Sequence, residues 1–471
     1  MIAISHRGSH KEQPVLRSSA ADPGVRLNVN GRTRIHGLAS EHTRLAWPVK
    51  VFLLGLIIPW VFPIGTVNLS LYRIVLLALL VPCLFMWLRG KAGKKKPADF
   101  GLLLFCAWAA IAFIAVEGVD QAIEPAGILF IETMGSYLLA RVYIRNVQDF
   151  QNMVIFVAKL IVCVLPFALY EWVTGKNLLL LAFGSIFRTE AITTMAPRMG
   201  FWRVQGPFSH SILFGTFCGS MVALTCLATK GRLSNPSRRS LTFLVGFAAL
   251  LSMSSAPIGG VFFQISLLLW NWILGGFAGR WKLIWTIALL GYLVVELGSN
   301  QTPAQFYISH FTFEQQTGWY RLSIWEYGSA SVASHPFFGI GLGDWARPAW
   351  MGDSVDNFWL LMAMRHGLPG LLLIVLSMLS ICFAIAKTKG SSPQVDDCRT
   401  SYLICMVAFA FVGSTVHFWV AAYAWFFFIV GSGVWILDSK LSRHAEGNRL
   451  LGMGRYAQGG GRAETPYQTA R

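Results

Sequence analysis

The sequence predicts an all-α, polytopic integral membrane protein with about 12 transmembrane helices. Hydrophobic residues make up 55% of the 471-residue chain and charged residues only 13%, which is too apolar for an ordinary soluble domain. Apolar runs of about 17–25 residues recur along the chain, and this length lets a helix cross roughly 30 Å of hydrocarbon. Lys and Arg residues also collect on alternate connections between the runs, as in multi-pass proteins.

Twelve apolar runs define the predicted spans of a transmembrane domain over 51–437. They lie near 51–66, 71–88, 99–116, 123–141, 152–173, 207–229, 241–256, 257–275, 283–298, 357–386, 401–414 and 415–437. Glu132 interrupts the fourth span, and only the break at 254–260 separates the seventh from the eighth. The count therefore depends most on these three spans.

Charge placement predicts the orientation. If the connections alternate between the two sides, one side receives 30 of the 39 Lys and Arg residues. Because such residues favour cytoplasmic loops, we expect that side to be cytoplasmic, with a basic tail over 1–50 and a flexible tail over 438–471. Loops 174–206 and 299–356 then face outward. The net charge of +17 follows from this topology and from contact with anionic membrane lipids, so no nucleic-acid partner is expected.

The stretch 318–370 is the polar, aromatic-rich exception in this apolar chain. It holds nine ionisable residues, which are Arg321, Glu326, His335, Asp344, Arg347, Asp353, Asp356, Arg365 and His366. A chain that gathers its ionisable groups in one outward segment is expected to do its chemistry there. The sequence contains no CxxC pair, HExxH helix or phosphate-binding GxxxxGK[ST] loop, so we expect no metal, no cofactor and no ATP-driven transport.

Further ionisable residues lie at the outward ends of other spans. Arg73 is near the outer end of the second span, Glu171 ends the fifth, and Arg203 and His210 flank the start of the sixth. A charge at the hydrocarbon edge costs about 2.5–3.5 kcal/mol on insertion scales, so it usually faces a cavity or a partner. Structural alternatives stay open: Arg73 can extend to lipid headgroups, Glu171 can close a helix end, and His210 can simply pack. Arg365 has the same alternative as Arg73.

Two arginines are distinguished by their sequence context. Arg203 follows Trp202 just before a span, and Arg321 lies where Tyr320 and Trp325 can form an amphipathic interfacial helix. A planar, permanently charged guanidinium suits bidentate binding of phosphate oxygens. The pair therefore suggests recognition of a lipid-linked phosphate or diphosphate. The alternative is that both arginines anchor loops through carbonyl and carboxylate groups.

Three segments resemble the O-antigen polymerase/ligase family, whose members are polytopic enzymes acting on polyprenyl-diphosphate-linked glycans. They are WRVQGPFSHSILFG (202–215), YRLSIWEYGSASVASHPFFGIGLGDW (320–345) and DNFWLLMAMRHGLPG (356–370). The middle segment is the most specific. The resemblance implies a GT-C-like fold in the bacterial inner membrane, with both termini cytoplasmic and a long periplasmic loop carrying short interfacial helices.

The function that the resemblance implies is glycosyl transfer from an undecaprenyl-diphosphate-linked oligosaccharide at the periplasmic face. The acceptor is a glycan or a lipid. Polymerisation of exopolysaccharide or O-antigen repeat units is the first expectation, and ligation to lipid A core is the alternative. A polysaccharide transporter or lipid-linked glycan flippase is the alternative from another class. Expected partners are membrane lipids and other polysaccharide export and chain-length proteins.

The resemblance also implies roles for individual residues. Arg203 and Arg321 match arginines expected to hold the diphosphate, and Asp356 stands where many relatives carry the histidine of a His–Asn pair. Asp356 is thus the candidate general base, with His210 or Glu171 as alternatives. The other residues expected to bind substrate are Arg73, Trp325, Glu326, Asn357 and Arg365.

A second departure from the family lies at 252–259, which lacks the arginine of a Ser–Arg pair that many relatives carry. A third contact to the diphosphate must then come from Arg73 or Arg365, or be absent.

Overall fold

The computed structural model describes residues 44–439 except 66, 194, 304, 307–314, 389 and 391. The predicted tails over 1–50 and 438–471 fall almost entirely outside the described residues. Within them the chain is mostly helical, with one two-stranded hairpin.

The N-terminal half contains α1 (Trp47–Ile57), β1 (Val61–Ile64), β2 (Val67–Ser70), α2 (Leu71–Leu88), α3 (Pro97–Glu117), α4 (Val119–Phe130), the π-helical turn η1 (Ile131–Gly135), α5 (Ser136–Tyr143), α6 (Val147–Thr174) and α7 (Leu178–Gly184). The C-terminal half contains α8 (Ser211–Ala223), the π-helical turn η2 (Leu224–Ala228), α9 (Asn235–Leu251), α10 (Ser255–Ile273), α11 (Arg280–Gly298), α13 (Gln315–Ser334), α14 (Phe358–Lys387), α15 (Pro393–Gly413) and α16 (Val420–Ser432).

Eight helical segments of the described chain are long and apolar enough to cross a membrane. They are Leu71–Leu88, Pro97–Glu117, Val147–Thr174, Ser211–Ala228, Ser255–Ile273, Arg280–Gly298, Phe358–Lys387 and Val420–Ser439. Length and composition thus identify a multi-pass membrane protein. The predicted span 241–256 runs past the end of α9 at Leu251, and the predicted span 401–414 ends with α15. The first turns of both helices carry charged residues. The count of twelve stays a prediction.

The first predicted span, 51–66, differs from the structure. The helix α1 ends at Ile57, and β1 and β2 pair antiparallel with Val61 opposite Ser70. Pro59 explains the break, because proline has no N–H to continue the helical ladder and disfavours helical backbone in the residue before it. The apolar run over 51–66 is therefore a short helix followed by half of a hairpin.

The fourth predicted span is a continuous helical segment made of α4, η1 and α5. Glu132 lies in the π-helical turn and is buried. Its Oε1 accepts hydrogen bonds from Arg73 Nε at 2.8 Å and from Tyr72 Oη at 2.5 Å. The carboxylate that interrupts the apolar run is thus paired with an arginine of α2, which offsets the cost of burying it.

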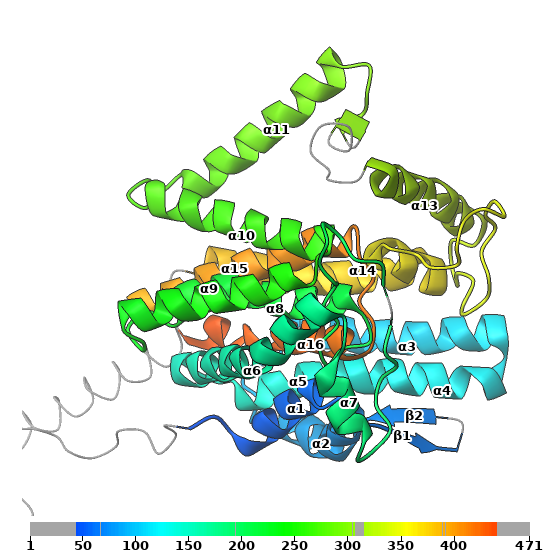
Figure 1. Ribbon diagram of the computed structural model, residues 1–471, viewed down its shortest axis with the longest axis horizontal. Coiled ribbons are helices and arrows are strands. Elements are labelled where there is room, and N and C mark those ends of the chain that lie inside the picture. The colour runs from blue at the N-terminus through cyan, green and yellow to red at the C-terminus, as the bar shows by residue number, and fades with distance from the viewer. Residues whose placement is uncertain are drawn as a thin grey trace, which may run out of the picture. The chain divides into compact units, whose positions relative to one another are not determined.

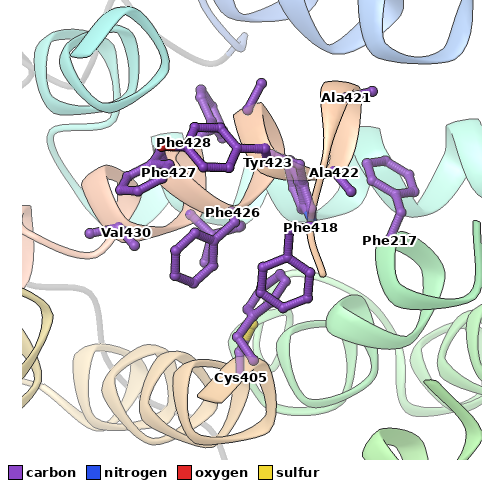
Figure 2. Close-up of a cluster of buried hydrophobic side chains, with 14 of the residues drawn as sticks. Phe217, Cys405, Phe418, Ala421, Ala422, Tyr423, Phe426, Phe427, Phe428 and Val430 are labelled. Atoms are coloured by element: carbon purple, nitrogen blue, oxygen red, sulfur yellow. The ribbon is translucent and has the colours of Figure 1, made fainter. Parts of the chain in front are cut away.

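The core centres on α16, which is apolar on every side and buried along its length. Such a helix must be surrounded by other helices. It packs against α5 and α8, and Figure 2 shows the aromatic cluster that results, with Phe217, Cys405, Phe418, Ala421, Ala422, Tyr423, Phe426, Phe427, Phe428 and Val430 labelled. The non-helical stretch 415–419 that precedes α16 is held to this core by Phe418, whose ring packs against Phe358 and Phe426.

The segments α11 and α13 lie to one side of the packed helices (Figure 1), whereas α10 packs against α8 and α15. No residue of α11 is buried, whereas α13 packs against α14. The helix expected around Tyr320 and Trp325 is present as α13. Its contact with α14 brings the polar stretch 318–370 back onto the helical bundle.

Candidate functional site

A cavity of about 1050 Å³ lies where four connections between helices converge. Its walls come from 198–212, from the turn at 254–257, from α13 with the segment 340–356 and the start of α14, and from 417–419. These segments are far apart in the sequence. Every one of the four connections is assigned to the outward face by the alternation of the predicted spans.

Five of the ten predicted site residues line this cavity together. They are Arg203, His210, Arg321, Asp356 and Arg365. The remaining five, which are Arg73, Glu171, Trp325, Glu326 and Asn357, are not part of its lining.

Arg73 lies in a separate ion pair with Glu132, and its Nη1 also donates to the Asn68 carbonyl at 3.0 Å. Arg73 and Arg365 were the two arginines that could supply a third contact to the diphosphate. Arg365 lines the cavity, and Arg73 does not.

Glu171 and Asn357 support the cavity from behind its walls. The buried Glu171 carboxylate accepts hydrogen bonds from the backbone N–H groups of Gln205 at 2.8 Å and Gly206 at 3.0 Å. The Asn357 side chain caps α14 by accepting from Leu360 N at 3.0 Å. Both residues thus fix backbone next to the cavity. Trp325 and Glu326 lie exposed on α13.

The turn that precedes α10 is bonded by two arginines of the 174–206 loop. Arg198 Nη1 donates to the Met253 carbonyl at 3.2 Å, and Arg203 Nη2 donates to Ser254 Oγ at 3.0 Å. Met253 has a φ of 47°, which is unusual for a residue with a side chain. The segment 252–259 contains no arginine, but its Met253 carbonyl and Ser254 hydroxyl hold Arg198 and Arg203 in the cavity wall.

A bend in α14 sets the position of Arg365. Gly367 has a φ of 69°, and a side chain there would collide with the Phe337 carbonyl. The bend frees carbonyls of the preceding turn, so that Met364 O accepts from Ile340 N at 2.7 Å and Arg365 O accepts from Gly341 N at 3.2 Å. The glycine-rich segment 339–343 is thus bonded to α14 at the residue whose side chain lines the cavity.

The segment 344–353 folds back over α13. Arg347 forms an ion pair with Asp344, and its Nε donates to the Met351 carbonyl at 3.2 Å. Gly352 N donates to Tyr320 Oη at 2.9 Å. The guanidinium of Arg347 also holds the pKa of the Asp344 carboxyl below its usual range. This part of the polar stretch is therefore ordered by its own charges.

Among the three aspartates that line the cavity, Asp356 is the one with a raised pKa. Burial raises the pKa of its carboxyl, while Arg321 and a hydrogen bond from Ser354 oppose the rise. A carboxylate with a raised pKa, next to a fixed cation, can accept a proton from a bound hydroxyl group. This is the property expected of a general base.

Two histidines of the lining stay neutral near pH 7. Burial and the charge of Arg203 lower the pKa of His210 to about 4, and burial and Arg365 lower that of His417 to about 3. His210 Nδ1 accepts from Ile212 N at 3.1 Å, so the neutral ring carries its proton on Nε2. His210 is therefore a hydrogen-bond donor here, and this geometry favours Asp356 over it as a base.

Sequence reasoning missed several residues of the lining as site residues. Arg198 and Arg347 lie in predicted outward loops, and their positive charge was the available signal. His417 and Trp419 were hidden within the apolar run 415–437, and their rings stack with centroids 5.5 Å apart. The non-helical backbone that presents them follows Gly413, and this glycine was the only hint.

No protein-family model matches the sequence, and a search of curated proteins found no match. Within the described ranges, no group of three or more His, Cys, Asp or Glu side chains is arranged to hold a metal ion. The geometry alone defines a class: a mostly helical, multi-pass membrane protein with one large cavity lined by five arginines and three aspartates. The net positive lining suits an anionic ligand.

Proposed function

We propose that the cavity binds the diphosphate of a polyprenyl-diphosphate-linked oligosaccharide and transfers its glycan to an acceptor hydroxyl on the outward side of the membrane. The observation that carries this proposal is the convergence of five arginines on one cavity, together with a half-buried carboxyl group whose pKa is raised, that of Asp356. Arginine is suited to phosphate oxygens because its planar fork makes two parallel charge-assisted bonds.

The cavity also suits a ligand with a hydrocarbon tail. Arg365 lies seven residues into α14, a candidate span, which is about 10 Å along the helix axis. A charge at that depth normally faces a polar cavity and not lipid. A diphosphate bound there can remain attached to a polyprenyl chain that lies in the bilayer, while the sugars occupy the part of the cavity lined by 340–356.

The proposed reaction uses Asp356 as the base. Its carboxylate takes the proton of the acceptor hydroxyl as the hydroxyl oxygen attacks the anomeric carbon of the donor. The bond between that carbon and the phosphate oxygen breaks, and its electron pair leaves with the polyprenyl diphosphate. Arg203, Arg321 and Arg365 stabilise the charge that develops on the leaving group. The activated donor supplies the free energy, so the reaction needs no nucleotide.

The wider assignment follows from the same proposal. The protein would reside in a bacterial inner membrane with about twelve spans in a GT-C-like arrangement and with cytoplasmic termini. The cavity draws only on connections predicted to face outward, and this supports the periplasmic side. Polymerisation of repeat units is the first choice, with ligation to lipid A core as the alternative. Other polysaccharide export and chain-length proteins would be its partners.

The direct test is glycan synthesis by purified protein in liposomes, with an undecaprenyl-diphosphate-linked repeat unit and with neither nucleotide nor ion gradient. We expect longer glycans and released undecaprenyl diphosphate from the wild-type protein. The Glu296→Gln variant, which changes an exposed carboxylate of α11, should behave like wild type. Movement of the donor across the bilayer without any change in glycan length would instead identify a flippase.

A further inference from the structure

A second cavity, of about 540 Å³, lies at the other end of the bundle. Its walls come from the turn between α5 and α6, the turn that follows η2, the start of α15, and the end of the α16 segment at 435–439. The continuous helix of α8 and η2 begins at the first cavity and ends at the second. Its 18 residues separate the two by about 27 Å.

Three buried polar atoms around this second cavity have no hydrogen-bond partner in the described part of the chain. They are Arg145 Nη1, Trp435 Nε1 and Asp438 Oδ2. Trp435 is only 3% exposed. Buried polar atoms are nearly always hydrogen-bonded in native proteins. The three atoms belong to residues that line one cavity, and a ligand there that offers two acceptors and one donor would pair them.

The electrostatics of the second cavity favour an anion. Two long helices, α6 and α15, begin at its wall, and the N-terminus of a helix carries partial positive charge. Arg145, Lys230 and Arg232 add full charges. Burial lowers the pKa of Arg145, and the attraction of Asp438 and Asp149 offsets this only in part, so its cation is poorly solvated. An anionic ligand would replace the missing solvation.

The acidic residue in the lining is already partly neutralised. Asp438 Oδ1 accepts from Lys96 Nζ at 2.6 Å, which leaves Oδ2 as the unpaired acceptor. Lys230 pairs with Asp397 at 3.1 Å, and Arg232 donates to Asn152 at 3.3 Å. Arg145, which Asp438 attracts without a hydrogen bond to its Nη1, and the Trp435 N–H are thus the donors still available to a ligand.

We infer that the second cavity binds a phosphate ester, with Arg145 and Trp435 donating to the phosphate oxygens and Asp438 Oδ2 accepting from a hydroxyl group of the esterified alcohol. Two sources share this chemistry: the headgroup of an anionic phospholipid such as phosphatidylglycerol, and a soluble phosphate ester. The connections that form the walls are those that the charge pattern assigns to the cytoplasmic side. This binding site is separate from the proposed glycosyl transfer and does not depend on it.

The inference is tested by binding to the full-length protein in phosphatidylcholine nanodiscs. One arm titrates sn-glycerol 3-phosphate, a second titrates inorganic phosphate, and a third replaces part of the lipid with phosphatidylglycerol and counts retained lipid by native mass spectrometry. We expect glycerol 3-phosphate or phosphatidylglycerol to bind, and inorganic phosphate to bind more weakly because it lacks the alcohol. The arm that responds identifies the source.

Variants assign the binding to this cavity. Trp435→Phe removes only an N–H group and should weaken binding about two- to tenfold, and Arg145→Gln should weaken it at least about tenfold. Arg239→Gln, an exposed arginine of α9, and Arg321→Gln, in the first cavity, should retain wild-type affinity. Equal binding by all variants would overturn the inference. Absence of binding in all three experiments would also overturn the inference. Ordered water would then be the partner of the unpaired atoms of Arg145, Trp435 and Asp438.

Discussion

The two cavities differ in the kind of chemistry that their walls allow. The first holds a carboxyl group with a raised pKa and two histidines with lowered pKa values, next to five arginines. In the described lining of the second, the acid is Asp438, which is held in an ion pair with Lys96. The group with a displaced pKa there is Arg145, but an arginine stays protonated, whereas carboxyl and imidazole groups with displaced pKa values are typical of sites that move protons. The comparison therefore suggests that the first cavity reacts with its ligand and the second only binds one.

The largest expected effect concerns the sides of the membrane. If the two cavities lie on opposite sides, alkaline phosphatase fused after residue 350 should be active and the same enzyme fused after residue 232 should be inactive. The outcome is close to all-or-none, because the reporter folds only outside the cytoplasm. The reverse pattern would invert the topology and remove the basis for glycosyl transfer at the first cavity.

The next effect separates chemistry from binding at the first cavity. Asp356→Asn should lower the turnover number by about 10²–10⁴, the usual contribution of a general base. The ionised Asp356 is disfavoured in the folded state, since folding raises its pKa above the unfolded value of about 3.9. Above both pKa values, the substitution should therefore leave Tm unchanged or slightly higher. Turnover near the wild-type rate would exclude Asp356 as the base.

A comparison of two arginines sharpens the boundary of the first cavity. Arg365→Gln should lower kcat/KM about 100-fold, because it removes charge stabilisation from the leaving group. Arg73→Gln should instead act on folding, because it leaves Glu132 buried without its ion-pair partner, at a cost of about 3 kcal/mol. Thermal unfolding and donor-concentration kinetics of both variants measure the difference. A kinetic defect in the Arg73 variant without any fall in Tm would return Arg73 to the site.

A smaller effect is expected in the pH profile. If Asp356 must be ionised, kcat/KM rises with pH as Asp356 loses its proton. Because burial raises the pKa of Asp356, this rising limb of the profile should lie at higher pH than for an ordinary aspartic acid. Arg321 lowers this pKa, so the residual activity of Arg321→Gln should show its limb at higher pH. Profiles of wild type and variant provide the test. A limb that does not move would mean that Arg321 and Asp356 do not interact in the working enzyme.

Much of the fold was predictable because hydrophobic length and charge placement are local properties. The spans that contain α2, α3, α6, α10 and α14 follow from apolar runs alone. The run 51–66 misled because hydrophobicity does not distinguish a helix from a hairpin, and Pro59 decided the outcome. Glu132 appeared to weaken its span because its partner, Arg73, is 59 residues away in the sequence.

The site was predictable to the extent that charge at a predicted outward end identifies it. This signal found Arg203, Arg321 and Arg365, which the structure brings to one cavity. The same signal gave Arg73 and Glu171, because a charge at a helix end is equally expected of an ion pair or of a carboxylate that caps backbone N–H groups. His417 could not be found, since its exposure to the cavity depends on how α16 is buried.

The most direct test of the central claim is to map where the donor binds. A photoactivatable undecaprenyl-diphosphate oligosaccharide would be crosslinked to the protein in liposomes, and the modified peptides would be identified by mass spectrometry. We predict crosslinks within 198–212 and 340–365 that unlabelled donor abolishes and that Arg321→Gln reduces. Crosslinks confined to lipid-exposed helices such as α11, unaffected by either change, would contradict the assignment of the first cavity as the glycosyl-transfer site.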